Sequence, residues 1–165
     1  MTVIGLGAWC DYVTEDEYRD RLLSLPPAPV PSWNGPPQPG RWSPLNRDVA
    51  KEALENFRRK LTFRVQEFAD VDDGRRITLH DERGYSTSGP EDPWQFQTSE
   101  SIEADVRTTV LPDDDDGEEH PWEWLVELLR AQGVDASVEE LKQVPYRVEF
   151  SQRLHDKLHS RAPSA

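Results

Sequence analysis

The stretch Leu61-Thr62-Phe63-Arg64-Val65-Gln66 alternates apolar and polar side chains at every step. A period of two is typical of a β-strand that packs one face against a core. Asp73-Gly74 follows and is a favoured hairpin dipeptide, and Ile77 and Leu79 then resume the alternation. These residues predict a β-meander at the centre of the fold.

Other strands are predicted on both sides of this pair. Arg83-Gly84 is interpreted as a second turn, which would start a third strand of the meander at Tyr85. An apolar stretch over residues 3–9 predicts an N-terminal strand. Pro145 is followed by Tyr146, Val148 and Phe150 on one face, which predicts a last strand.

Helices are predicted where capping signals precede apolar residues three or four positions apart. Thr14 with Glu17, and Ser137 with Glu140, each have the spacing of a capping box. The clearest amphipathic helix follows Ser43-Pro44, and its apolar side chains are those of Leu45, Val49, Ala53, Phe57 and Leu61. Further helices are predicted after a cap at Thr98 or Ser99 with Ile102, Val106 and Val110 as its apolar residues, from Pro121 to near Gly133, and over residues 151–160.

This order of elements predicts an α+β fold in a single domain over residues 1–165. Its mainly antiparallel sheet of about 4–5 strands would have several helices packed against it. Residues 26–44 are predicted to form a proline-rich coil, 112–120 an acidic loop and 161–165 a frayed tail. Eight of the 19 residues from 26 to 44 are proline. We interpret them as an ordered coil that fixes Trp33 and Trp42 on the core, and an exposed PxxP arm is the alternative.

Negative charge is concentrated in the middle of the chain. Residues 65–123 contain 18 Asp and Glu against four Lys and Arg, whereas the remaining residues contain 14 acids and 15 bases. This segment therefore accounts for the whole-chain charge of -13. Such an asymmetry favours a basic partner and opposes binding to nucleic acid or to anionic membranes.

Composition also indicates the cellular compartment of the protein. One cysteine, Cys10, cannot form an internal disulfide, which favours a reducing cytoplasm. The apolar start, residues 1–9, has no preceding basic residue and does not resemble a signal peptide. No stretch approaches the roughly 18 apolar residues that a membrane span requires. We therefore expect a cytoplasmic protein that does not enter a membrane.

Motifs of known chemistry are weak or absent. Gly5 and Gly7 imitate the start of a dinucleotide-binding loop, but the third glycine is missing. If Gly117 took the sixth position of a calcium loop, the first position would fall on Pro112, which has no carboxylate. His155 and His159 stand four residues apart and could share a metal, although a surface helix face is the preferred interpretation. We therefore expect no catalytic residue, no cofactor and no metal site.

Tryptophans flank the acidic segment. Aromatic rings surrounded by acids are good contacts for Arg and Lys, through cation–π interaction and charge pairing. Trp94 or Trp124 would anchor a partner. The alternative is that Trp122 packs inward while Trp124, on another face of the helix, only covers the meander. The predicted docking face consists of Glu91, Asp92, Trp94, Asp113, Asp114, Asp115, Asp116, Glu118, Glu119 and Trp124.

In size, acidity and α+β pattern the chain resembles the immunity proteins of bacterial toxin systems. The resemblance implies an inhibitor, monomeric when free, whose acidic face docks on the basic active-site cleft of a cognate toxin. Two alternatives stay open. One is a small enzyme, with a metal-assisted site or without one, around His80, Asp81 and His120, which predicts a pocket that holds these groups. The other is an adaptor subunit that uses its proline-rich arm.

Overall fold

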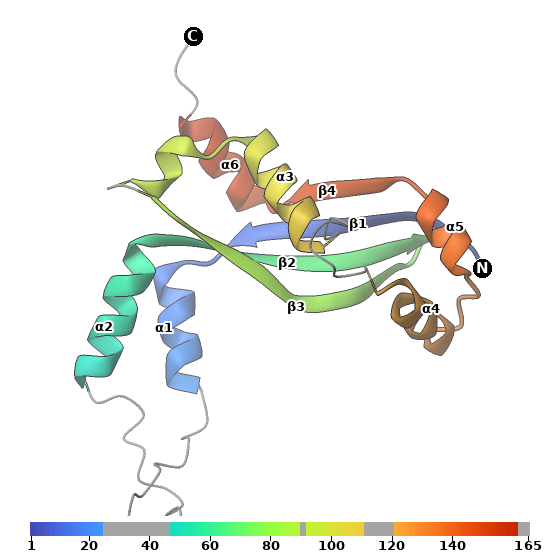
Figure 1. Cartoon of the computed structure of the whole chain (residues 1–165), viewed down its shortest axis with the longest axis horizontal. Coiled ribbons are helices and arrows are strands. Elements are labelled where there is room, and N and C mark those ends of the chain that lie inside the picture. Colours follow the sequence, from blue (N-terminus) through green and yellow to red (C-terminus); the bar gives the residue numbers. More distant parts are fainter. Residues whose placement is uncertain (25–46, 90–91, 111–120, 162–165) are drawn as a thin grey trace, which may run out of the picture. The chain divides into compact units, whose positions relative to one another are not determined.

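The structure is a computed structural model that describes residues 1–24, 47–89, 92–110 and 121–161 (Figure 1). The predicted proline-rich coil and acidic loop lie outside the described residues. The elements in chain order are β1 (Val3–Tyr12), α1 (Glu15–Ser24), α2 (Arg47–Arg58), β2 (Lys60–Val71), β3 (Arg76–Ser88), the short 3-10 helix η1 (Pro93–Phe96), α3 (Ser99–Val110), α4 (Trp122–Ala131), α5 (Val138–Gln143), β4 (Tyr146–Phe150) and α6 (Gln152–Arg161).

The chain divides into two compact units. One consists of Met1–Tyr12, Thr62–Ser86 and Trp94–Ala165, and the other consists of Val13–Leu61 and Thr87–Pro93. In the second unit, Tyr18 of α1 stacks on Phe57 of α2 with ring centroids 4.4 Å apart. Arg58 donates to both carboxylate oxygens of Glu15 at 3.0 and 2.6 Å. The single domain predicted over residues 1–165 stays a prediction.

The sheet of the first unit has the strand order β3-β2-β1-β4. β1 and β2 are antiparallel, and β2 and β3 form a hairpin in which Gly74 has a φ of 88°. β4 is parallel to β1, with Leu6 opposite Tyr146 and Cys10 opposite Phe150. The α+β class with a mainly antiparallel sheet is therefore confirmed.

The second turn of the meander is a wrong prediction, because β3 is one continuous strand from Arg76 to Ser88. Gly84 lies within it for a steric reason. A Cβ at this position would lie 2.5 Å from the carbonyl oxygen of Phe63 on the neighbouring strand. Glycine here marks a close approach of two backbones rather than a turn. Tyr85, on the same strand, stacks on Phe63 with ring centroids 4.9 Å apart.

Several predicted boundaries also shift. β1 extends to Tyr12, and α2 ends at Arg58, so Leu61 belongs to β2 rather than to the helix. Leu61 fits the helical spacing of the apolar residues before it and also the alternation of the strand residues after it. Because the structure places it in the strand, the helix ends earlier than predicted. Arg161, the first residue of the predicted tail, belongs to α6, and residues 162–165 lie outside the described residues.

Capping signals are confirmed where the structure describes them. The amide of Glu17 donates to the Thr14 hydroxyl at 3.2 Å, and Glu17 accepts from the Thr14 amide at 2.9 Å. Ser137 and Glu140 form the same reciprocal pair at the start of α5. Gly133 follows α4 with a φ of 79°, a conformation that glycine adopts without strain.

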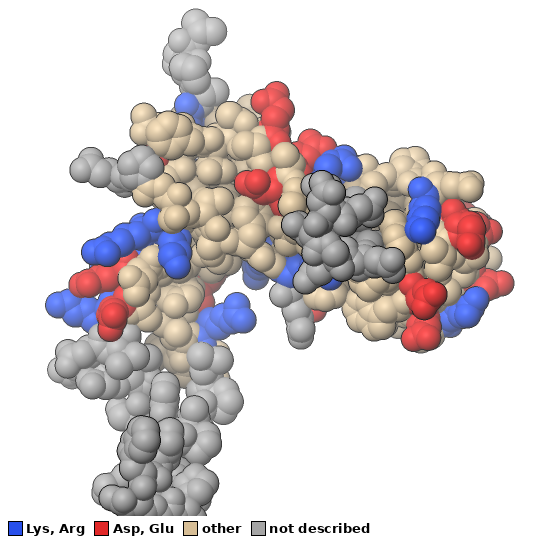
Figure 2. All heavy atoms as spheres, in the orientation of Figure 1, with Lys and Arg blue, Asp and Glu red and all other residues tan. Residues whose placement is uncertain are grey.

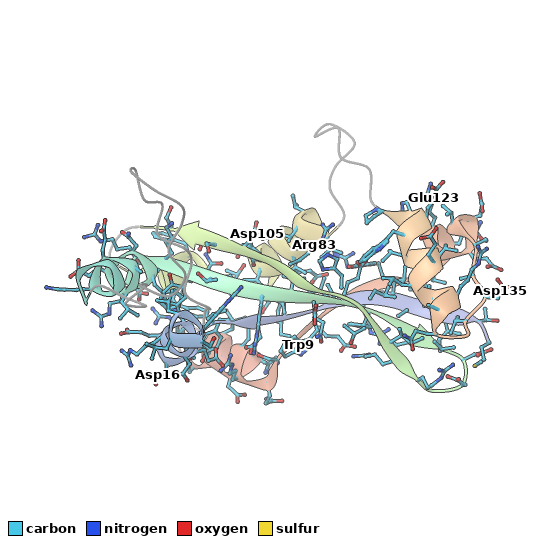
Figure 3. The ribbon with its side chains drawn as sticks, turned by 90° about the horizontal axis from the view of Figure 1, so that it is seen from below. Trp9, Asp16, Arg83, Asp105, Glu123 and Asp135 are labelled. Atoms are coloured by element: carbon cyan, nitrogen blue, oxygen red, sulfur yellow. The ribbon has the colours of Figure 1, made fainter. Side chains whose placement is uncertain are left out.

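Helices cover the two faces of the sheet unequally (Figures 1 and 3). α3, α4 and α5 lie over one face, which we call the core face, and α6 lies on the other. The core includes side chains from both strands and helices: Leu6, Phe63, Val65, Ala69, Val71, Leu79, Ile102, Val106, Leu125, Leu129, Leu141 and Leu154. Among the described residues, no helix is both long enough and apolar enough to cross a membrane.

Candidate functional site

The predicted docking face is described at three of its ten residues. Asp92, Trp94 and Trp124 lie in described segments, and the acids at 91, 113–116, 118 and 119 lie outside them. Asp92 is half-buried directly before η1. The geometry of the site is therefore set by the two tryptophans and by the charged side chains near them in the sequence.

Trp124 lies near the N-terminus of α4 and is 41% exposed, one of few large apolar side chains so exposed among the described residues. One edge of its ring contacts His80 of β3, with centroids 5.5 Å apart and planes at 69°. Trp122 lies on the other side of the helix, where it packs against the hydrophobic core. Trp122 thus packs inward and Trp124 covers part of β3, as the alternative without a partner expects, and the role of Trp124 as an anchor stays a prediction.

Two acidic side chains lie beside Trp124 on one side of α4. Glu123 and Glu127 are exposed and four residues apart, and Glu123 projects from α4 away from the sheet (Figure 3). Figure 2 shows acidic side chains over α4 and α5 together with Lys and Arg side chains. From residue 108 to residue 129 the sequence has eight Asp and Glu and no Lys or Arg. Among the described residues, neither Glu123 nor Glu127 forms an ion pair.

Trp94 has a different environment. Its ring meets Tyr12 and Phe63 edge-on, at centroid distances of 5.2 and 6.1 Å, and the Lys157 ammonium lies 5.5 Å from its centroid. Phe63 stacks on Tyr85, which is five residues along β3 from His80, the contact of Trp124. Five residues of strand span roughly 17 Å. The two tryptophans are therefore separate sites, and only Trp124 is flanked by acids on its own helix.

The carboxylate of Asp11, at the end of β1, is neutralised inside the fold. It is buried and accepts from Arg153 Nε at 2.9 Å, from Arg64 at 3.3 Å and from Ser151 Oγ at 2.5 Å. Burial opposes its ionisation, but the hydrogen bonds from Arg153 and Ser151 outweigh burial and lower its pKa below the ordinary value. Asp11 therefore fastens β1 to the start of α6 and is not available to a partner.

A second neutralised cluster lies on the face of the sheet opposite the core face. Arg76 of β3 donates to Asp70 of β2 at 2.8 Å and to Glu149 of β4 at 2.7 Å. Arg147 of β4 donates to the same two carboxylates. These four side chains form a closed ring of alternating charge, which we call the charge ring. Hydrogen bonds from Arg76 are the leading cause that lowers the pKa of both Asp70 and Glu149.

Packing beneath the charge ring explains Gly7, one of the two glycines that imitate a nucleotide-binding loop. β1 lies between β2 and β4, and Phe68 of β2 lies flat across it at Gly7. The guanidinium of Arg76 stands 3.8 Å from the centre of the Phe68 ring. A Cβ on Gly7 would lie 2.6 Å from Phe68 Cζ. Gly7 is therefore glycine because it leaves room for this ring, and no phosphate is needed to explain it.

An open pocket of about 500 Å³ lies apart from the acidic face. The start of α3 and the end of α6 form its walls, and its lining residues are Trp94, Gln95, Gln97, Thr98, Ser99, Glu100, Leu158, His159 and Arg161. The enzyme alternative places its site at His80 and Asp81 of β3, which are not part of this lining. His120 lies outside the described residues. Sequence reasoning missed the pocket because its walls come from segments about 60 residues apart.

No protein-family model, curated protein or solved structure matches the chain. The interpretation of the site therefore rests on its own geometry and charge.

Proposed function

We propose that this chain is a non-catalytic binding protein, an immunity protein whose acidic face docks on the basic active-site cleft of a cognate bacterial toxin. The supporting observation is the environment of Trp124. This half-exposed ring lies on α4 beside the exposed Glu123 and Glu127, and α4 follows the acidic segment 113–119 in the sequence. A large aromatic side chain with acids beside it fits a partner rich in Arg and Lys.

The contrast with the other carboxylates supports this assignment. Asp11, Asp70 and Glu149 each accept hydrogen bonds from two arginines. Their negative charge is therefore neutralised within the fold, where it holds the strands and α6 together. Glu123 and Glu127 have no such partner among the described residues. Uncompensated charge at an exposed position adds little to folding stability but produces a field that a cationic surface can use.

Toxins that act on nucleic acid, or on a cofactor that carries phosphate, need a basic cleft. An acidic protein can occupy this cleft by imitating the phosphate charge, and electrostatic steering accelerates the encounter. Trp124 would then supply the buried anchor that slows dissociation. Under this proposal the chain acts in the cytoplasm, as a monomer when free, and needs no cofactor.

The test begins with capture of the partner from the native host at low and at moderate salt, followed by purification of both proteins. We expect a variant with Asp113, Asp115, Glu118 and Glu123 changed to Lys to lose binding. It should also fail to rescue cells that express the captured toxin. Trp124→Ala should weaken binding about 30-fold, because removing an anchor residue costs about 2 kcal/mol.

The matched control changes Asp20, Glu52, Glu55 and Asp156 to Lys. These exposed acids lie on α1, α2 and α6, so the net charge changes equally while the acidic segment stays intact. This control should keep binding and rescue. Deletion of residues 33–39 should also leave binding intact, whereas an adaptor that uses its proline-rich arm would lose it. A folded Lys variant of the acidic segment that still binds as tightly as the wild type would refute the proposal.

A further inference from the structure

α6 carries a polar stripe that the proposed function does not use. Gln152, His155, Asp156 and His159 follow at spacings of three, one and three residues, so they share one face of the helix. Both histidines and Asp156 are exposed, and Gln152 donates to Asp156 at 2.8 Å. The stripe therefore presents two imidazoles and a carboxylate to solvent.

The two imidazole rings lie against each other. Their centroids are 3.9 Å apart, and their planes differ by 29°. Nδ1 of His159 lies 2.8 Å from the carbonyl oxygen of His155. A carbonyl oxygen can only accept, so this hydrogen bond places a proton on Nδ1 of His159 and leaves the lone pair on its Nε2. The same bond fixes the orientation of the ring.

This arrangement is the one that metal-binding histidines show. Such a histidine usually donates its second ring nitrogen to a carbonyl or carboxylate, which fixes the tautomer and directs the other nitrogen to the metal. Metal–nitrogen bonds of roughly 2.0–2.1 Å place two adjacent donor nitrogens about 3 Å apart. Histidines at i and i+4 lie on consecutive turns of one helix face, which is the spacing by which two helical histidines reach one ion.

We propose that His155 and His159 chelate one divalent transition-metal ion of the class that prefers imidazole, namely Cu²⁺, Ni²⁺ or Zn²⁺. In the described part of the chain, no group of three or more His, Cys, Asp or Glu is arranged to hold a metal. The site therefore has two protein ligands, and water or a ligand from a partner takes the remaining positions.

Two of the three Lys and Arg side chains of α6 are directed elsewhere: Arg153 to Asp11, and the Lys157 ammonium over the Trp94 ring. The third, Arg161, lines the pocket together with His159. Asp156 adds a negative charge next to His155. Because His159 also lines the pocket of about 500 Å³, the bound ion would lie at the border of that pocket.

The test uses the full chain without a polyhistidine tag and titrates it with Ni²⁺ by isothermal calorimetry. The buffer contains about 0.15 M salt, because this screens attraction of the ion to exposed charges more than about 8 Å away. We expect one ion per chain. His155→Gln and His159→Gln should each weaken binding at least roughly tenfold, since loss of even an outer partner of a ligand costs this much. His80→Gln is the control, because it removes a histidine outside α6, and it should bind Ni²⁺ like the wild type.

Pulsed electron paramagnetic resonance with Cu²⁺ supplies a second readout. The wild-type spectrum should show two coordinated imidazoles, and each single variant should show one. Far-ultraviolet circular dichroism should show unchanged helix content in all variants. If the variant that combines His155→Gln with His159→Gln binds Ni²⁺ with wild-type affinity, or if the Cu²⁺ spectrum shows no imidazole, the ion is held elsewhere and the proposal is wrong.

Discussion

Gly7 provides a sharp test of how the sheet is held together. A Cβ at this position would lie 2.6 Å from Phe68 Cζ and 2.5 Å from the carbonyl oxygen of Arg147. Neither neighbour can withdraw easily, because Phe68 is 2% exposed beneath the guanidinium of Arg76 and Arg147 belongs to the neighbouring strand β4. We therefore predict that Gly7→Ala destabilises the protein.

The size of the effect follows from three contributions. Overpacking costs about 1–3 kcal/mol, and partial exposure of the Phe68 side chain costs about 1 kcal/mol more. The lower entropy of the unfolded Ala chain offsets about 0.4–1 kcal/mol. The net loss in free energy of unfolding is about 2 kcal/mol. For a chain of this size that corresponds to a melting temperature lower by roughly 4–8 °C.

Urea denaturation, followed by circular dichroism, measures this loss. Gly5→Ala is the matched control in the same strand, because its Cβ would meet only one side-chain atom, Nη1 of Arg147, within 3.4 Å, at 3.1 Å, and no backbone atom that close. It should cost less than about 1 kcal/mol. If Gly7→Ala is as stable as the wild type, or no less stable than Gly5→Ala, then the close contact of Gly7 with Phe68 and the Arg147 backbone does not explain the glycine.

Two further predictions concern β1. Asp11→Asn should lower the free energy of unfolding by about 2 kcal/mol at neutral pH, the scale of hydrogen bonds to a charged group. Because folding lowers the pKa of Asp11, its contribution is complete above the unfolded pKa of about 3.9 and is lost as the pH falls through the folded value. The gap between variant and wild type in urea titrations should therefore narrow below about pH 4, and a gap independent of pH would contradict the ion pairs. Burial raises the pKa of the Cys10 thiol to about 12, so iodoacetamide should label it roughly a thousandfold or more slowly than in urea, as mass spectrometry would show. Equal labelling rates would contradict its burial.

Local signals in the sequence predict local structure well. Thr14 with Glu17, Ser137 with Glu140 and Gly133 each act within one turn of helix, so the residues that decide the conformation lie side by side in the chain. Gly84 is misleading because a glycine in a turn and a glycine in a close strand pair look identical in one sequence. Only the position of Phe63 opposite it distinguishes the two.

Long-range features could not be predicted. Arg147 and Asp70 are 77 residues apart, and they meet only because β1 lies between β4 and β2 with Gly5 and Gly7 in the right register. The pocket and the contact of Trp94 with Lys157 depend in the same way on how segments meet. The exposed Trp124, by contrast, follows from the helical period of α4, because Leu125, Val126 and Leu129 determine the buried side.

The parallel pairing of β1 with β4 has a consequence for biosynthesis. More than 130 residues separate Tyr12 from Tyr146, and a ribosome needs on the order of ten seconds to make them. Throughout this interval one flank of the central strand has no partner, and an open flank of this kind invites pairing with other chains. Products that terminate before Tyr146 should therefore aggregate, and the nascent protein depends on prompt arrival of its final strand.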